Sequence, residues 1–148
     1  MDPEIHAKSF RGSKPPKMEV ENWTCPEPAI QGKFVLIDFW ATWCAPCRAS
    51  IPHLNQLQSK FKDKLVVIGL TDEPLATVKE MKSPIIEYAV ASDTKARMAK
   101  AAEVQGIPHV MLIDPSGIVR FEGMPKYLDE KGLGRLLDKY AGEEPHER

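Results

Sequence analysis

The sequence predicts an α/β fold in which a central mixed sheet carries helices on both of its faces. Short, near-continuous apolar runs alternate with segments whose apolar residues recur at helical spacing, a pattern typical of buried strands separated by covering helices. Towards the C-terminus, two further apolar runs flank Asp-Pro-Ser-Gly at 114–117, which indicates a hairpin. Strands that alternate with helices and finish in a hairpin favour a mixed sheet.

The first half of the chain contains four expected elements. We expect an edge strand at 18–23 from its weak alternation, a buried strand at 34–40 from a continuous apolar run, a helix at 48–61 from apolar residues at helical spacing, and a second buried strand at 64–70. The prolines that follow Cys25 separate the first two elements.

The second half adds helices and strands in alternation. We expect a helix opened by Glu73–Pro74 and ending near Ser83, a strand at 85–91, a helix at 95–104, strands at 110–113 and 118–121, and an amphipathic helix at 129–140. Ser-Asp-Thr at 92–94 suits the start of the third helix, and Gly106 suits its end.

Composition is that of an ordinary globular domain. The chain has 148 residues, of which 43% are hydrophobic and 28% charged, so it can bury a core without disulfide staples. A formal net charge of -1 gives no electrostatic reason to expect nucleic acid or an anionic membrane as a partner. No apolar run reaches the roughly 18 residues of a membrane-spanning helix.

We expect one domain at 18–141 with two short flanks. Residues 1–17 carry prolines, lysines and a glycine, and they predict a lead that is disordered or left over from cloning. Residues 142–148 predict a frayed tail. The first residues do not form a signal-peptide pattern, so we expect either a cytosolic protein or one whose signal or anchor is absent from this sequence.

Cys44 and Cys47 form a Cys-x-x-Cys pair within Trp-Cys-Ala-Pro-Cys at 43–47, at the junction of a predicted strand and helix. Backbone N–H groups and the helix dipole at this position favour a thiolate, so the pKa of Cys44 should lie below the free value of about 8.5. Such a thiolate attacks a disulfide, and Cys47 then reaches back to release the product. Pro46 stiffens the loop.

Other interpretations of the cysteines stay open. Zinc normally needs four ligands, and Cys25, Cys44, Cys47 and His53 are the only cysteine-rich set available. A thiol peroxidase would usually place its reactive cysteine in a different motif, which we do not find. We interpret Cys25 as a small buried hydrophobe, with a thiol partner or a redox accessory as alternatives.

Residues 39–47, Phe-Trp-Ala-Thr-Trp-Cys-Ala-Pro-Cys, resemble the active-site signature of the thioredoxin superfamily. Gly32–Lys33, the Ala-Thr-Trp lead-in and the Asp-Pro-Ser-Gly hairpin are most similar to its TlpA/ResA-like branch. The resemblance covers residues 18–141. It implies a thioredoxin-like fold with an N-terminal strand extension and a helix–strand insertion, which we place at 73–91.

The resemblance also assigns roles around the cysteine pair. Asp38 matches a buried aspartate that assists the second cysteine, here Cys47, and burial would raise its pKa. The alternative is an aspartate at the edge of a strand that reaches solvent. Gly-Ile-Pro at 106–108 resembles the cis-proline loop, in which the backbone of Ile107 pairs with substrate and Pro108 shapes the groove. The alternative is a trans turn.

Trp43 is expected to cover the cysteine pair and, with Ala45 and Pro46, to contact a partner, whereas Trp40 is equally well explained by core packing. We interpret Arg48 as a solvated charge on the helix face, with a positive charge close to the thiolate as the alternative.

Two positions depart from the branch. Ser50 stands where ResA-like proteins often carry a glutamate, and Gly69 stands where thioredoxins have a lysine. His109 follows the proline loop and is assigned either to the surroundings of the sulfurs or to the surface.

The resemblance implies a thiol-disulfide oxidoreductase, most simply a protein disulfide reductase in the periplasm or another extracytoplasmic space. Its partners would be protein disulfides and an upstream thiol reductant. We expect a monomer that needs no cofactor beyond the Cys44–Cys47 disulfide. The alternatives are a thiol oxidant, a cytoplasmic thioredoxin, a metal-binding module and a peroxidase.

Overall fold

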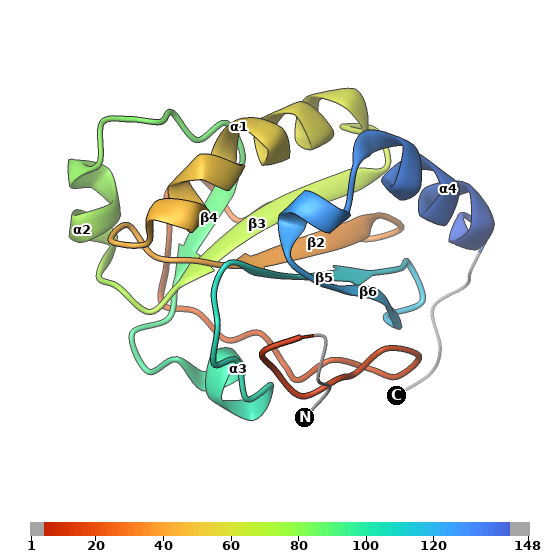
Figure 1. Cartoon of the computed structure of the whole chain (residues 1–148), viewed down its shortest axis with the longest axis horizontal. Coiled ribbons are helices and arrows are strands. Elements are labelled where there is room, and N and C mark those ends of the chain that lie inside the picture. Colours follow the sequence, from red (N-terminus) through yellow and green to blue (C-terminus); the bar gives the residue numbers. More distant parts are fainter. Residues whose placement is uncertain (1–4, 143–148) are drawn as a thin grey trace.

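Six strands form one mixed sheet in the order β1-β4-β3-β2-β5-β6 (Figure 1). The structure, a computed structural model, describes residues 5–142. The strands are β1 Asn22–Trp23, β2 Phe34–Phe39, β3 Leu65–Thr71, β4 Ala89–Ser92, β5 His109–Ile113 and β6 Val119–Gly123. β2, β3 and β4 run parallel, whereas β1, β5 and β6 are antiparallel to their neighbours. The predicted mixed sheet is confirmed.

Helices cover both faces of this sheet, as predicted. They are α1 Ala45–Lys60, α2 Leu75–Glu80, α3 Arg97–Ala101, the single 3-10 turn η1 Pro125–Tyr127 and α4 Glu130–Tyr140. α1 and α4 lie on one face, and α3 lies on the other with the N-terminal segment (Figure 1). No helix among residues 5–142 is both long and apolar enough to cross a bilayer.

The alternation of side chains along β2 decides what faces the long helices. Leu36 and Trp40 pack with the α1 core, whereas Ile37 and Phe39 pack with the α3 core. Because successive side chains of a strand point to opposite faces, Asp38 points to the α1 face. The continuous apolar run therefore places one carboxyl group inside the core beneath α1.

The insertion at 73–91 and the helix after it are less regular than predicted. α2 ends at Glu80 rather than near Ser83, and the strand expected at 85–91 forms only as β4. The helix expected at 95–104 is limited to α3 because Ala96 and Glu103 have left-handed backbone conformations (φ 50° and 53°) at its two ends. Gly106 does not end this helix, since its N–H donates to the carbonyl of His6.

The prediction of a disordered lead at 1–17 is wrong for residues 5–17, whereas residues 1–4 lie outside the described part. Ile5 and Ala7 are buried. The carboxylate of Glu122 accepts hydrogen bonds from the Ser9 hydroxyl and from the N–H groups of Phe10 and Arg11. The carboxylate of Glu122, on β6, thus accepts hydrogen bonds from a segment for which the sequence indicated no structural partner. The tail predicted at 142–148 lies, apart from Gly142, beyond the described residues.

Candidate active site

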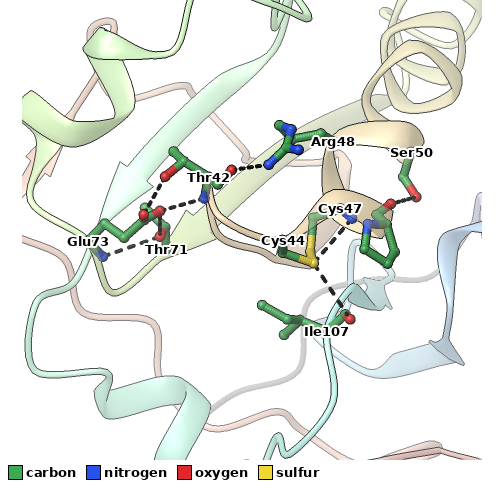
Figure 2. Close-up of a disulfide and its surroundings, with 9 residues drawn as sticks. Thr42, Cys44, Cys47, Arg48, Ser50, Thr71, Glu73 and Ile107 are labelled. Carbon is green, nitrogen blue, oxygen red and sulfur yellow. Dashed lines mark hydrogen bonds between the residues drawn. A yellow bond between two sulfur atoms is a disulfide. The ribbon is translucent and has the colours of Figure 1, made fainter.

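A disulfide joins Cys44 and Cys47 at the N-terminus of α1 (Figure 2). Cys44 is the extended N-cap residue of the helix, and its sulfur accepts a hydrogen bond from the N–H of Cys47 at 3.2 Å. Pro46 occupies the first turn, where a missing N–H costs nothing. The expected junction of strand, cysteine pair and helix is confirmed, and it aims a helix N-terminus at the Cys44 sulfur.

The two sulfurs differ in access. Cys44 is 4% exposed and Cys47 is 0% exposed, while Ala45 and Pro46 between them are exposed. Trp43, the residue before Cys44, is 72% exposed, so most of its ring faces solvent rather than the core. A partner that approaches this end of α1 therefore meets Cys44 first.

The Ile107–Pro108 loop lies against the disulfide. The Ile107–Pro108 peptide bond is cis, as expected, and the Cys44 sulfur is 3.8 Å from the carbonyl oxygen of Ile107. Pro108 is buried and Ile107 is half-buried. The structure thus brings the predicted proline loop and the cysteine pair together.

Two pockets flank the pair. One, of about 220 Å³, is mostly apolar and is lined by residues that include Trp43, Ile107, Phe39 and Val104. The other, of about 370 Å³, lies beyond Pro46 and Pro108, and Ser50, His53 and Lys126 also line it. Trp43 and Ile107 line the first pocket and Pro46 and Pro108 line the second, so residues next to the cysteine pair and of the proline loop contribute to both.

Asp38 is fully buried on the α1 face, the face that also buries Cys47. Neither of its carboxylate oxygens has a hydrogen-bond partner among residues 5–142. Burial raises the pKa of Asp38 well above its ordinary value. The alternative of an aspartate that reaches solvent is wrong, because the whole strand β2 lies between two helical layers.

Gly69 lies directly opposite Asp38 on β3. A methyl group on Gly69 would come within 2.9 Å of the indole nitrogen of Trp40 and 3.3 Å of the ring of Tyr88. The indole nitrogen is buried without a partner among the described residues. Burial, together with the charge of Asp38, raises the pKa of Tyr88. The rings of Trp40 and Tyr88 therefore fill the space beside Gly69, the position at which the sequence departs from the lysine of thioredoxins.

Three polar residues that sequence reasoning did not single out meet beside the disulfide: Thr42, Thr71 and Glu73 (Figure 2). The interpretation of Arg48 as a merely solvated charge is wrong, because its Nη1 donates to the carbonyl of Thr42 at 2.6 Å. A hydroxyl two residues before a cysteine and a Thr-x-Glu after a strand are weak signals, which explains why they were missed.

The remaining candidates differ in their burial and in their contacts. His109 is 2% exposed and packs against the ring of Phe39 on the α3 face, so the surface assignment is wrong. Cys25 is exposed, which contradicts its interpretation as a buried hydrophobe. His53 contacts the carbonyl of Leu128 at 2.8 Å. Within residues 5–142, no three His, Cys, Asp or Glu side chains gather in a way that could hold a metal ion.

Ser50, in the place of the expected glutamate, donates its hydroxyl to the carbonyl of Pro46 at 3.1 Å. At this position the chain therefore has an uncharged hydroxyl that is hydrogen-bonded to the backbone of α1.

The sheet order, the disulfide at the start of α1 and the proline loop against it place the chain among thioredoxin-fold proteins with a Cys-x-x-Cys site. More narrowly, residues 7–122 match the AhpC/TSA family, and the chain belongs to that family.

The chain is similar in sequence to proteins named for thiol-disulfide chemistry. The chain is 30% identical over 158 residues to the thiol:disulfide interchange protein DsbE of Escherichia coli K12, covering 96% of this chain and 82% of DsbE. It is 31% identical over 93 residues to the thiol-disulfide oxidoreductase ResA of Bacillus subtilis, covering 61% of this chain and 52% of ResA. The chain thus spans about half the length of the ResA relatives that it matches.

A crystal structure of a thiol:disulfide interchange protein of the thioredoxin family from Chlorobium tepidum is similar in three dimensions. The TM-score is 0.58 at 30% sequence identity, and the match covers 76% of this chain and 83% of that one.

Proposed function

We propose that this protein is a thiol-disulfide oxidoreductase that reduces disulfides in partner proteins through Cys44 and Cys47. The observation that carries the proposal is the position of the Cys44 sulfur: it caps α1, accepts the N–H of Cys47 and lies beside the Ile107–Pro108 loop. The names of its DsbE and ResA relatives support the same activity.

In the reduced protein, the Cys44 thiolate attacks one sulfur of the partner disulfide. A bond forms between Cys44 and that sulfur, the partner's S–S bond breaks, and the second partner sulfur leaves as a thiolate that takes up a proton. Cys47 then loses its proton and attacks the Cys44 sulfur. This step forms the Cys44–Cys47 disulfide and releases the first partner sulfur as a thiol. Two electrons pass to the partner, and an upstream thiol reductant restores the dithiol.

Asp38 is proposed as the acceptor of the Cys47 proton. Its carboxyl group lies on the same face of the sheet as Cys47, and both side chains are fully buried. A carboxylate that has no hydrogen-bond donor within the described part of the chain and a raised pKa is more basic than an ordinary one, which suits transfer of a thiol proton.

We propose that a partner segment binds in extended form over the pair. The backbone of Ile107 would pair with it, Pro108 would shape the groove, and Trp43, Ala45 and Pro46 would contact its side chains. We also propose an extracytoplasmic, periplasmic location and a monomeric state, on the similarity to TlpA/ResA-like proteins.

Reduction of a disulfide-containing protein by excess dithiothreitol tests the activity. The wild-type chain should accelerate it, and Cys44→Ser should abolish the acceleration. When reduced Cys47→Ser is mixed with the disulfide-containing protein in the absence of dithiothreitol, it should trap a mixed disulfide with that partner. Cys25→Ser is the matched control and should behave as wild type. Turnover of hydrogen peroxide that survives in Cys47→Ser would favour a peroxidase instead, and stoichiometric metal in protein purified under reducing conditions would favour a binding module.

Equilibration with glutathione tests the direction of electron flow. A reductase should have a potential well below about -120 mV, the value of a strongly oxidising disulfide donor. A potential close to that value would assign the chain to the thiol oxidants.

A further inference from the structure

Thr42, two residues before Cys44, is hydrogen-bonded through its N–H, its hydroxyl and its carbonyl (Figure 2). Its N–H donates to Oε1 of Glu73 at 2.8 Å, and its hydroxyl donates to Oε2 of Glu73 at 2.5 Å. On the other side, its carbonyl accepts from Nη1 of Arg48 at 2.6 Å. A residue of the loop that leads to Cys44 is therefore fixed by one carboxylate and one guanidinium.

Glu73 is itself held by the sheet. The hydroxyl of Thr71, a buried residue of β3, donates to Oε1 of Glu73 at 2.8 Å and accepts from the N–H of Glu73 at 3.2 Å. The hydroxyl of Ser92, buried on β4, donates to the carbonyl of Glu73. Glu73 is thus hydrogen-bonded to two parallel strands, β3 and β4, and its carboxylate also binds Thr42 in the loop before Cys44.

Besides the bonds to Thr42, the loop between β2 and α1 is joined to β3 where the N–H of Trp40 donates to the carbonyl of Leu70 at 3.1 Å. The N–H of Cys44 donates to the carbonyl of Ala41 at 3.2 Å, and α1 begins at Ala45. The orientation of Cys44 towards the N–H of Cys47 and towards Ile107 depends on how the preceding residues enter the helix. Hydrogen bonds to charged groups are the stronger class, and two of the three bonds to Thr42 use a carboxylate while the third uses a guanidinium.

We infer that Glu73, at the start of the insertion, is a positioning residue for Cys44. Through Thr42, and against the opposing contact of Arg48, it holds the Cys44 sulfur where the helix N-terminus stabilises a thiolate. The inference rests on the proposed function for its biological meaning. It also assigns a role to the insertion at 73–91, because Glu73, its first residue, links β3 and β4 to the loop that precedes Cys44.

Two substitutions separate positioning from charge. Glu73→Gln keeps a carbonyl oxygen for the Thr42 and Thr71 donors, and its amide can donate to the Thr42 hydroxyl. Glu73→Ala removes every side-chain contact. Glu80→Ala is the matched control, since Glu80 is an exposed carboxylate at the end of α2 in the same insertion.

The test is the rate of alkylation of reduced Cys44 by iodoacetamide as a function of pH, measured in Cys25→Ser protein with the thermal unfolding midpoint recorded beside it. In Glu73→Ala the apparent pKa of Cys44 should rise towards the free value of about 8.5, and alkylation near neutral pH should slow about tenfold. Glu73→Gln and Glu80→Ala should retain the wild-type profile.

An unchanged pH profile in Glu73→Ala, whatever its unfolding midpoint, would overturn the inference. So would a fall in the apparent pKa of Cys44 in both Glu73→Ala and Glu73→Gln, because the loss of a nearby negative charge, and not the loss of positioning, would then act on Cys44. Alkylation needs no partner protein, so a chain that fails to reduce protein disulfides contradicts the proposed function without affecting this test.

Discussion

Asp38 and Asp114 are two buried aspartates of the same sheet, and their surroundings are opposite. Asp38 on β2 has no hydrogen-bond partner among residues 5–142. Asp114, which follows β5, accepts from the N–H and hydroxyl of Ser116, the N–H of Ile118 and Nε of Arg120, at 2.6 to 3.1 Å. One carboxyl group lies in surroundings that oppose a negative charge, and the other in surroundings that support it.

The pKa directions follow from these contacts. Burial raises the pKa of Asp38. Burial also acts to raise the pKa of Asp114, but the hydrogen bonds from Ser116, Arg120 and Ile118 outweigh it and the net pKa is lowered. A partnered carboxylate close to a hairpin serves the fold. A buried carboxylate such as Asp38, with no hydrogen-bond partner among the residues that the structure describes, is retained at a cost in stability and suits chemistry.

The two groups should give opposite slopes of stability against pH. Both titrate near 3.9 in the unfolded chain. The stability from Asp114 is present above about that value and is lost as pH falls through its lower folded pKa. With Asp38 the folded state holds the proton more tightly, so its contribution falls as pH rises from about 3.9 towards the raised folded pKa.

The largest effect is expected for Asp114→Ala, which removes the carboxylate to which Nε of Arg120 and the N–H groups of Ser116 and Ile118 donate. Removing one partner of a buried pair costs about 3–5 kcal/mol, and we expect a loss in that range by urea unfolding near neutral pH. Asp72→Ala, at an exposed site, should change the free energy of unfolding by less than about 0.5 kcal/mol. If Asp114→Ala lost as little as this control, the structural role of Asp114 would be refuted.

Asp38→Asn should move stability in the other direction. The amide cannot ionise, so the variant avoids the cost of holding a proton in the folded state. The gain should grow from about zero near pH 4 to about 1–3 kcal/mol near pH 7. Urea unfolding at several pH values measures it, and a loss of stability that is independent of pH would show that Asp38 has a partner.

Gly69→Ala should have a smaller effect. Its methyl group would lie 2.9 Å from the Trp40 indole nitrogen, so the aromatic cluster next to Asp38 must shift. We expect a loss of about 1 kcal/mol by thermal or urea unfolding. Gly142→Ala is the control, because nothing lies within 4 Å of a methyl group there. Equal stabilities for the two variants would mean that the space beside Asp38 is not filled.

Much of this architecture could be predicted from local patterns. The apolar runs predicted β2, β3 and β5 to within a residue or two, because a strand buried on both faces must be apolar throughout. The same rule identified Asp38 as a charged residue within an otherwise apolar strand. The cysteine pair was readable because its chemistry needs only a short local motif at a helix start.

Contacts between distant residues could not be predicted. The N-terminal segment is ordered by Glu122, more than 100 residues away, and the Thr42 loop by Glu73, 31 residues away. In both cases a carboxylate accepts hydrogen bonds from backbone N–H groups of a segment far away in the sequence, and no local motif predicts such a contact.

The proton acceptor role of Asp38 is tested most directly by the second step of the reaction. A partner disulfide-linked to Cys44 is released when Cys47 attacks, and stopped-flow measurement of this release over pH reports the ionisation of Cys47. Asp38→Asn should slow release near neutral pH by about 10²-fold, with the difference disappearing at alkaline pH where hydroxide removes the proton. Equal rates and equal pH profiles for the wild type and Asp38→Asn would contradict the account.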